Sequence, residues 1–297
     1  MDLSTFIVAV FCLVDDWLEG KKLRQRGPDP ELSDSEVLTI EIVGEHLGID
    51  TEEGLYAYFR RHYAEWFPAL RGVHRTTFTR QAANLWAVKE ELQKHLLGCV
   101  GFDPQVSLID SFPVEVCRFA RAYRCRRLAE ESAFGYDETR KQTFYGLRAH
   151  LLVCWPGVIV GVDLAPADVH ELRMAEELLL EGVVVEVEEG WVLGDRNYWS
   201  PDLAERLGEE GLSLLAPCKS KKREEQPWPR WLVHKRRRIE TVFSQLVERY
   251  QAKKVWARDR WHLTSRFMRK VLSHTTAVYF CQQVGLSPLR FAELLTD

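Results

Sequence analysis

Residues 106–112 read Val-Ser-Leu-Ile-Asp-Ser-Phe, an apolar, strand-forming run that carries a carboxylate at Asp110. A second apolar run, Trp191-Val-Leu-Gly194, is followed in the same way by Asp195. An aspartate after a strand usually forms part of a turn. Two such aspartates on neighbouring strands could instead bind Mg²⁺, which prefers carboxylate oxygens. We therefore take Asp110 and Asp195 as the first candidate site residues.

A third carboxylate, Glu240, lies on a helix predicted over about 231–250, in the run Arg-Arg-Arg-Ile-Glu-Thr-Val-Phe-Ser-Gln. The apolar stripe of this helix consists of Leu232, Ile239, Val242 and Leu246. Glu240 lies about 100° around the helix from Ile239, at the border of the predicted buried face. Two aspartates and a glutamate in this order are the ligands that metal-dependent phosphoryl transfer requires.

The chain from about residue 101 alternates strands with helices. Strands are expected at 106–112, 144–154, 158–164, 191–195 and 212–216. Asp168 is expected to cap a helix after the third strand, and Ser200-Pro201 begins another. Three strands, helix, strand, helix, strand, helix is the order of a ribonuclease H-like, mixed α/β sheet. In that topology the strands of Asp110 and Asp195 are neighbours.

Residues 1–100 predict helices throughout. Ser33-Asp-Ser-Glu36 is a capping box, and further helices are expected over about 52–66 and 76–97. Their basic, polar patches fit a helix-turn-helix DNA-binding module, and an all-helical segment that caps a second domain would show the same pattern. We predict an all-helical N-terminal domain over 1–100 and a ribonuclease H-like catalytic domain over 101–297. The latter has an Arg-rich insertion at about 117–142 and basic C-terminal helices.

The charge of the chain is strongly polarised. The formal net charge is −4, yet 17 Lys and Arg against five Asp and Glu fall between Lys219 and Lys270, a net charge of +12. The remainder therefore carries −16. Such polarisation indicates a nucleic-acid surface, and a solvated charged helix face is the plainer alternative. The candidate DNA contacts are Arg236, Arg237, Arg238, Lys253, Lys254, Arg121 and Arg124.

Several other classes of protein find no support. The seven cysteines are scattered without a Cys-x-x-Cys pair, which indicates reduced thiols and no zinc site. The apolar run 6–14 is too short for a membrane span and is interpreted as the buried face of a first helix. Glycine-rich phosphate loops and serine-hydrolase or zinc-protease motifs are absent from the sequence. We expect a cytoplasmic protein without a membrane or small-molecule partner.

The contexts Leu-Ile-Asp110-Ser-Phe-Pro-Val, Gly-Asp195-Arg-Asn-Tyr198 and Arg236-Arg-Arg-Ile-Glu240-Thr-Val-Phe-Ser-Gln245 together resemble bacterial insertion-sequence transposases of the DDE class. Within that class the chain looks closest to the insertion-sequence group nine-eighty-two. The resemblance implies that Asp110, Asp195 and Glu240 bind the catalytic Mg²⁺ ions, for which Mn²⁺ can substitute. It also implies double-stranded DNA partners, namely terminal inverted repeats and target DNA, and a nucleoid-associated homodimer.

Two positions depart from the signature of this family. Many such transposases have a tyrosine three residues before the arginine that matches Arg236, and a lysine seven residues after the glutamate. Val233 and Val247 occupy these positions here. The resemblance implies cleavage at element ends followed by strand transfer. A catalytically inactive DNA-binding relative and a purely hydrolytic nuclease of the same fold remain the alternatives.

Overall fold

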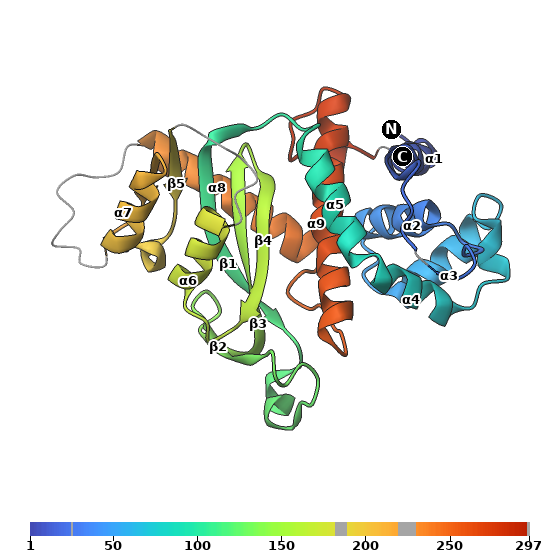
Figure 1. The fold of residues 1–297 in the computed structure, drawn as a ribbon, viewed down its shortest axis with the longest axis horizontal. Coiled ribbons are helices and arrows are strands. Elements are labelled where there is room, and N and C mark those ends of the chain that lie inside the picture. The colour runs from blue at the N-terminus through green and yellow to red at the C-terminus, as the bar shows by residue number, and fades with distance from the viewer. Residues whose placement is uncertain (25, 182–188, 219–229, 296–297) are drawn as a thin grey trace. The chain divides into compact units, whose positions relative to one another are not determined.

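The computed structural model describes residues 1–24, 26–181, 189–218 and 230–295, and Figure 1 shows its fold. The chain folds into two compact units. A helical unit contains 1–100, 248–251 and 261–297, and a sheet unit contains 101–247 and 252–260. None of the described helices is long and apolar enough to cross a membrane. Residues 219–229, whose polar composition predicts a linker, and the side chain of Leu232 lie outside what the structure describes.

The helical unit begins with five α-helices and a short 3₁₀ turn. Their bounds are α1 Leu3–Leu18, α2 Asp34–His46, α3 Glu52–His62, η1 Pro68–Arg71, α4 Arg75–Asn84 and α5 Trp86–Leu97. The capping box is confirmed, because Ser33 and Glu36 each accept the other's backbone N–H at the start of α2. The run 6–14 does supply the buried face of α1, through Phe6, Ile7, Val10 and Val14.

One predicted helix is in fact two, because the chain breaks at Leu85 between α4 and α5. In a continuous helix the carbonyl of Ala82 would accept the backbone N–H of Trp86. Here that carbonyl accepts hydrogen bonds from Lys89 Nζ and Ser265 Oγ, each at 2.9 Å. These side-chain donors replace the helical bond.

The last long helix, α9 (Arg260–Gln283), belongs mostly to the helical unit, whereas the sequence assigned 261–297 to the catalytic domain. The cause is a buried charge network. Arg269 donates to Glu45 Oε1 and to the Asp50 carbonyl, each at 2.6 Å, and Lys270 donates to the same Glu45 at 3.0 Å. Two cations of the basic C-terminal segment therefore neutralise buried acids of the helical unit and do not form an exposed surface.

The described part of the sheet unit contains a six-stranded sheet. The strands are β1 Asp103–Glu115, β2 Ala133–Asp137, β3 Gln142–Trp155, β4 Val158–Pro166, β5 Gly190–Leu193 and β6 Leu212–Leu215. Their order is β2-β3-β1-β5-β6, with β4 also paired to β3. β1 and β3 are antiparallel, as are β3 and β4, whereas β5 and β6 run parallel to β1. All five strands predicted from the sequence are present, and β2, inside the Arg-rich segment, was missed.

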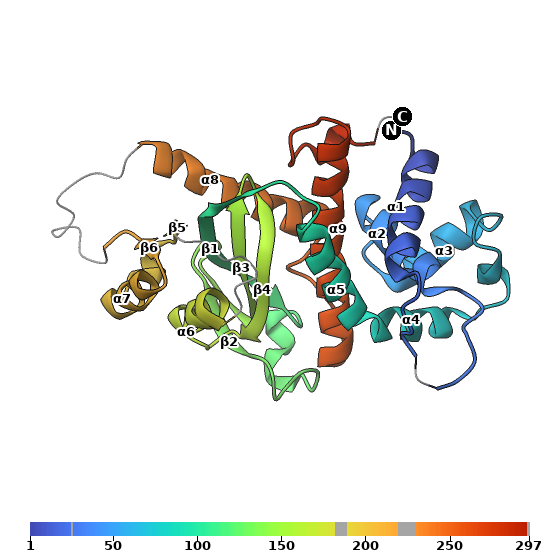
Figure 2. The same cartoon turned by 45° about the horizontal axis from the view of Figure 1, so that its top comes forward.

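Helices cover both faces of this sheet (Figures 1 and 2). One face carries α6 (Glu171–Glu176) and α7 (Pro201–Glu209), and the other carries α8 (Arg230–Ser244). Side chains of a strand alternate between faces. Accordingly Ser111 of β1 bonds to Glu171 of α6, whereas the next residue, Phe112, packs edge-on against Phe243 of α8 with ring centroids 5.2 Å apart.

Of the helix caps near the sheet, the one at the start of α6 differs from the prediction. Ser200 caps α7 and Pro201 occupies its first turn, as predicted. The cap of α6 is His170 instead of Asp168, because the His170 ring accepts the backbone N–H of Leu172 at 3.2 Å. Glu171 thereby becomes the first residue of α6 and lies near the sheet.

Candidate active site

Asp110 and Asp195 lie on neighbouring parallel strands at matching positions. The register pairs Leu108 of β1 with Leu193 of β5, so that Asp110 and Asp195 each follow two residues later. β5 ends at Leu193, and the chain then forms a short 3₁₀ segment, η4 (Arg196–Tyr198). Asp195 caps this segment by accepting the Asn197 N–H at 2.8 Å. The structure thus brings together the two aspartates that the sequence selected.

Burial and like charge act together on this pair. Burial raises the pKa of Asp110 to about 7, and the charges of Asp195 and Glu171 add to the rise. Burial also raises the pKa of Asp195, with a further contribution from Glu171. The positive charge of Arg236 opposes the rise in both cases. A cation placed between these carboxylates would relieve their repulsion.

Glu171 is a site residue that the sequence reasoning did not select. Its Oε1 accepts hydrogen bonds from Ser111 Oγ at 2.8 Å and from Arg148 Nη1 at 3.1 Å. The other terminal nitrogen of Arg148 donates to the Tyr136 carbonyl at 2.9 Å. Ser111 follows Asp110, and its backbone N–H donates to Asp110 Oδ1 at 2.7 Å. Glu171 and Arg148 therefore fix the segment that carries Asp110.

Tyr198 brings a buried hydroxyl to the same place. The side chain is fully buried, and among the described residues its hydroxyl makes no hydrogen bond of standard geometry, although the Ser111 side chain lies close enough to lower the pKa of Tyr198. Burial raises the pKa of Tyr198 well above its usual value, and the charges of Asp110, Glu171 and Asp195 add to the rise, so the phenol stays protonated. Such an unsatisfied buried donor is uncommon in a folded protein. It is available to a group that enters the site.

Gly194 makes room for this arrangement. A Cβ atom at residue 194 would lie 2.8 Å from the Cβ of Tyr198, closer than two carbon atoms can approach. Glycine therefore allows the chain to fold back from β5 into η4 and to bury the Tyr198 ring. In the motif Gly-Asp195-Arg-Asn-Tyr198 the first residue is therefore required for steric reasons, whereas Asp195 and Tyr198 bring polar groups to the site.

The helix α8 approaches the site from the face of the sheet opposite to α6 (Figure 2). Its buried side chains Ile239 and Val242 match the predicted stripe, and Arg236 acts electrostatically on both aspartates. Glu240 lies one turn after Arg236 on the same side of the helix. The Glu240 side chain is exposed in this structure. No group of three or more His, Cys, Asp or Glu side chains within the described ranges is arranged to hold a metal ion.

The predicted DNA contacts differ in how accessible they are. Arg237, Lys254, Arg121 and Arg124 are exposed. Arg238 lies over the Trp155 ring, 5.0 Å from its centroid. Lys253 is half-buried beside Asp137, with 3.7 Å between its Nζ and a carboxylate oxygen. The last two cations therefore already have partners within the protein.

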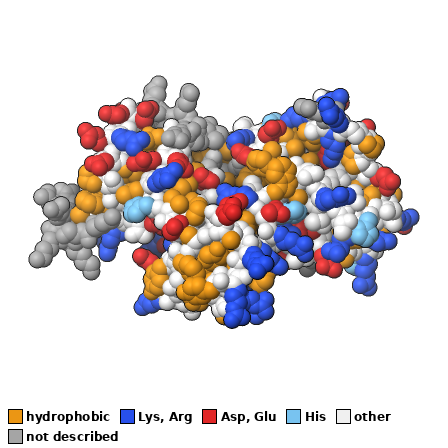
Figure 3. All heavy atoms as spheres, turned by 60° about the horizontal axis from the view of Figure 1, so that its bottom comes forward, with side chains coloured by type: hydrophobic (Ala, Val, Ile, Leu, Met, Phe, Trp, Pro, Cys, Tyr) orange, Lys and Arg blue, Asp and Glu red, His pale blue; other side chains and the backbone are white. Residues whose placement is uncertain are grey.

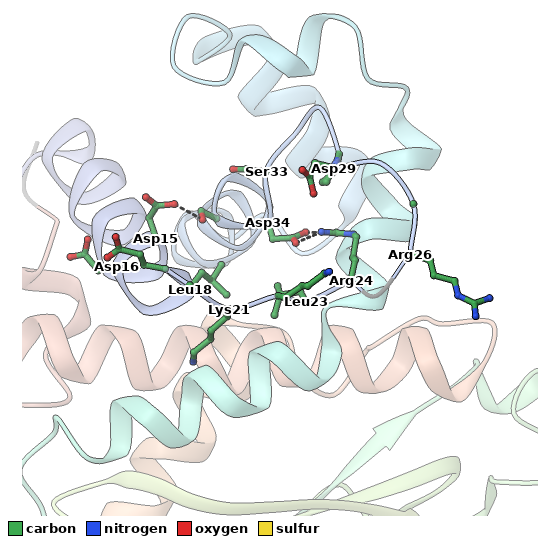
Figure 4. A pocket seen from close by; sticks show the side chains of 16 residues that line it. Asp15, Asp16, Leu18, Lys21, Leu23, Arg24, Arg26, Asp29, Ser33 and Asp34 are labelled. Atoms are coloured by element: carbon green, nitrogen blue, oxygen red, sulfur yellow. Dashed lines mark hydrogen bonds and ion pairs between the residues drawn. The ribbon is translucent and has the colours of Figure 1, made fainter.

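A hollow of about 930 Å³ lies in the helical unit, between the end of α1 and the start of α2 (Figure 4). Its lining mixes acids with bases. Arg24 pairs with Asp34 across it, and Ser35 donates to Asp15 at 2.6 Å. Because the lining mixes both signs of charge and Arg24 is already paired with Asp34, we assign no function to this hollow.

Comparison with known proteins identifies the chain. A family described as transposase DDE domain matches residues 101–260, more than half of the 297 residues. No curated protein matches significantly. Among solved structures, the cryo-EM structure of the piggyBac transposase synaptic complex with hairpin DNA matches with a TM-score of 0.48 and 11% identity, over 99% of this chain and 79% of that one. The match to residues 101–260 includes both aspartates and α8, and the chain belongs to the family of DDE transposases.

Proposed function

We propose that this transposase cuts DNA at the ends of an insertion element and joins the exposed 3′ hydroxyl to target DNA, in a reaction that requires a divalent metal. The observation that carries the proposal is the half-buried pair Asp110 and Asp195 at matching positions of neighbouring strands, with the positive charge of Arg236 acting on both. Phosphodiester cleavage builds negative charge on the reacting phosphate, which this arginine can partly neutralise.

The residues present fit a divalent cation. The negative charge of Asp195 raises the pKa of Asp110 in a half-buried place, and the Tyr198 hydroxyl makes no hydrogen bond of standard geometry there among the described residues. Asp110, Asp195 and Glu240 would hold Mg²⁺, with Mn²⁺ as a substitute. A bound ion would supply activation of the attacking oxygen and stabilisation of the leaving one. Arg236 then binds the phosphate, and Tyr198 donates a hydrogen bond to an oxygen in the site.

The remaining parts of the chain have proposed roles in DNA handling. The pairing of β4 with β3, β3 with β1, β1 with β5 and β5 with β6, in which β5 and β6 run parallel to β1, supports a ribonuclease H-like core. The N-terminal helices bind the terminal inverted repeats, and the exposed cations of α8 bind the DNA backbone. Two element ends must be joined at once, which favours a homodimer. A bacterial, nucleoid-associated insertion-sequence transposase of group nine-eighty-two fits these roles.

The test is cleavage of a plasmid that carries the element's own ends, with purified protein and Mg²⁺. We expect Asp195→Asn to lower the cleavage rate by at least about a hundredfold, because the variant keeps the shape of the side chain but loses its charge. Asp163→Asn is the matched control, since Asp163 lies on β4 and its Oδ1 accepts the backbone N–H of Leu164. This variant should cleave at the wild-type rate.

The products distinguish the remaining alternatives. Joined target DNA shows strand transfer, whereas cleavage without joining indicates a nuclease that only hydrolyses. If Asp195→Asn cleaves as fast as the wild type, the proposed metal site is wrong. DNA binding without any cleavage by the wild-type protein would favour a catalytically inactive relative.

A further inference from the structure

A group of aromatic side chains is exposed on the segment that follows β1. Phe119 is 46% exposed, Tyr123 85%, Phe134 40% and Tyr136 51%. We call these four residues the aromatic patch. Three of the rings are neighbours, because the Phe134 centroid lies 6.2 Å from that of Phe119 and 5.1 Å from that of Tyr123, and Tyr136 follows two residues after Phe134 on β2. Contiguous exposed apolar surface of this kind usually marks a binding site.

The patch lies among unpaired positive charges. Arg118, Arg121 and Arg124 occur in the same segment, all exposed, and none forms an ion pair with a carboxylate in the described ranges. Figure 3 shows the face that comes forward with the lower end of the sheet unit, where hydrophobic side chains gather beside Lys and Arg side chains. Rings interleaved with arginines favour a negatively charged partner that also has flat apolar surfaces.

The patch is connected to the candidate active site through Arg148. This arginine bonds the Tyr136 carbonyl with one nitrogen and Glu171 with another, and it also reaches Ser111 Oγ at 3.3 Å. Phe134 belongs to β2 and packs on Tyr145 of β3, with centroids 5.0 Å apart. The segment is therefore anchored to the same strands that position Asp110.

The reach between the two places corresponds to a few nucleotides. From Asp110 to Glu115 the chain advances five residues, roughly 17 Å at strand rise. Glu115 pairs with Gly146, which is next to Tyr145, the residue against which Phe134 packs. A DNA strand advances about 3.4 Å per nucleotide, so roughly five nucleotides cover this distance. A strand with its phosphate at Asp110 can thus place its neighbouring bases on the patch.

We propose that the aromatic patch binds unpaired bases of the DNA strand that flanks the cut phosphate, by stacking them on its rings while the arginines hold the backbone. The proposal rests on the proposed function, because it takes DNA in the active site as given. Fully paired bases are already stacked in the duplex and present their edges instead of their faces. Aromatic platforms with basic neighbours are how proteins bind single-stranded nucleic acid without reading sequence.

The experiment measures binding by fluorescence anisotropy in EDTA, so that no cleavage occurs. One probe is a blunt duplex, and the other is the same duplex with a single-stranded thymidine tail of about eight nucleotides. We expect Tyr123→Leu to weaken binding of the tailed probe about tenfold and to leave the blunt duplex unchanged. Trp191→Leu is the matched control: Trp191 is 41% exposed but lies at the start of β5, opposite the end near Asp110, and it should change neither affinity.

Each outcome has a defined meaning. Equal loss on both probes, or no loss on either, would overturn the proposal. A shift of Tyr123→Leu from dimer to monomer in light scattering, with tail binding intact, would identify the patch as a contact between copies of this chain and would also overturn it. If the wild-type protein binds neither probe, the proposed function itself fails, which separates that result from a failure of the patch alone.

Discussion

At the scale of a single residue, Asp110 makes the metal-free protein sensitive to pH. Its pKa rises from 3.8 to about 7 on folding, so between these values the folded protein keeps a proton that the unfolded chain loses. Stability therefore falls as the pH rises through this window. We expect Asp110→Asn to be more stable than the wild type at pH 8 in EDTA, by on the order of 2–4 kcal/mol, and to show little difference near pH 4. Thermal unfolding at both pH values checks this, and equal melting temperatures at pH 8 would contradict it.

Tyr198 separates a structural from a functional role in the same place. A buried hydroxyl without a partner costs about 1–3 kcal/mol, so Tyr198→Phe should be at least as stable as the wild type. We expect the same variant to cleave DNA about tenfold more slowly, because it cannot donate to an oxygen in the site. A loss of both stability and cleavage would show that the hydroxyl is structural.

The residues of the site were predictable to different degrees for physical reasons. Asp110 lies within an apolar strand and Asp195 just after one, and the parallel pairing of these strands places them at matching positions, so a sequence pattern was enough. Glu171 comes from α6, and its place depends on the packing of that helix against Ser111 and Arg148, which the local sequence does not encode. The role of Glu240 as a metal ligand stays a prediction.

At the scale of the elements, the close antiparallel pairing of β1 and β3 depends on Gly146. A Cβ atom at residue 146 would lie 2.2 Å from the Val114 carbonyl oxygen, which is backbone and cannot rotate away. We expect Gly146→Ala to destabilise the protein by several kcal/mol, because the two strands must separate. Gly208→Ala is the control: no atom lies within 4 Å of its added Cβ in α7, so a gain of about 0.5–1 kcal/mol is expected. Urea unfolding measures the free energy of unfolding of both variants. Similar changes in the two would show that the close approach of residue 146 to the Val114 carbonyl does not require glycine.

The elements themselves followed from periodicity wherever a run was long and apolar. β2 was missed because its residues, Ala133–Asp137, alternate small side chains with exposed rings and lie within an Arg-rich segment. Pairing with Gln142–Gly146 of β3 stabilises this strand, and that partner is set by the turn between them and not by the composition of β2. The break at Leu85 likewise depends on Lys89 and Ser265, of which the second lies far away in sequence.

At the scale of the whole molecule, sequence charge alone overstated the DNA surface. The basic segment from Lys219 to Lys270 crosses from the sheet unit into the helical unit, where Arg269 and Lys270 are buried against Glu45. Exposed cations of α8 and the following segment, such as Arg237 and Lys254, are the ones that we propose contact DNA. A count of charges cannot distinguish these two uses, because only the packing of α9 decides which cations face water.

The difference between exposed and buried cations can be measured as the salt dependence of DNA affinity. DNA affinity should fall steeply with salt, since each phosphate contact releases counterions. We expect Arg237→Gln to reduce the slope of log affinity against log salt by about one, with unchanged stability. Arg269→Met should leave the slope unchanged and destabilise the helical unit by about 3–5 kcal/mol, because Glu45 loses one of its two buried partners. Anisotropy titrations at several salt concentrations, combined with thermal unfolding, test both variants. If Arg269→Met lowers the slope as Arg237→Gln does, the buried network takes part in DNA binding and the division of the basic segment into two uses is wrong.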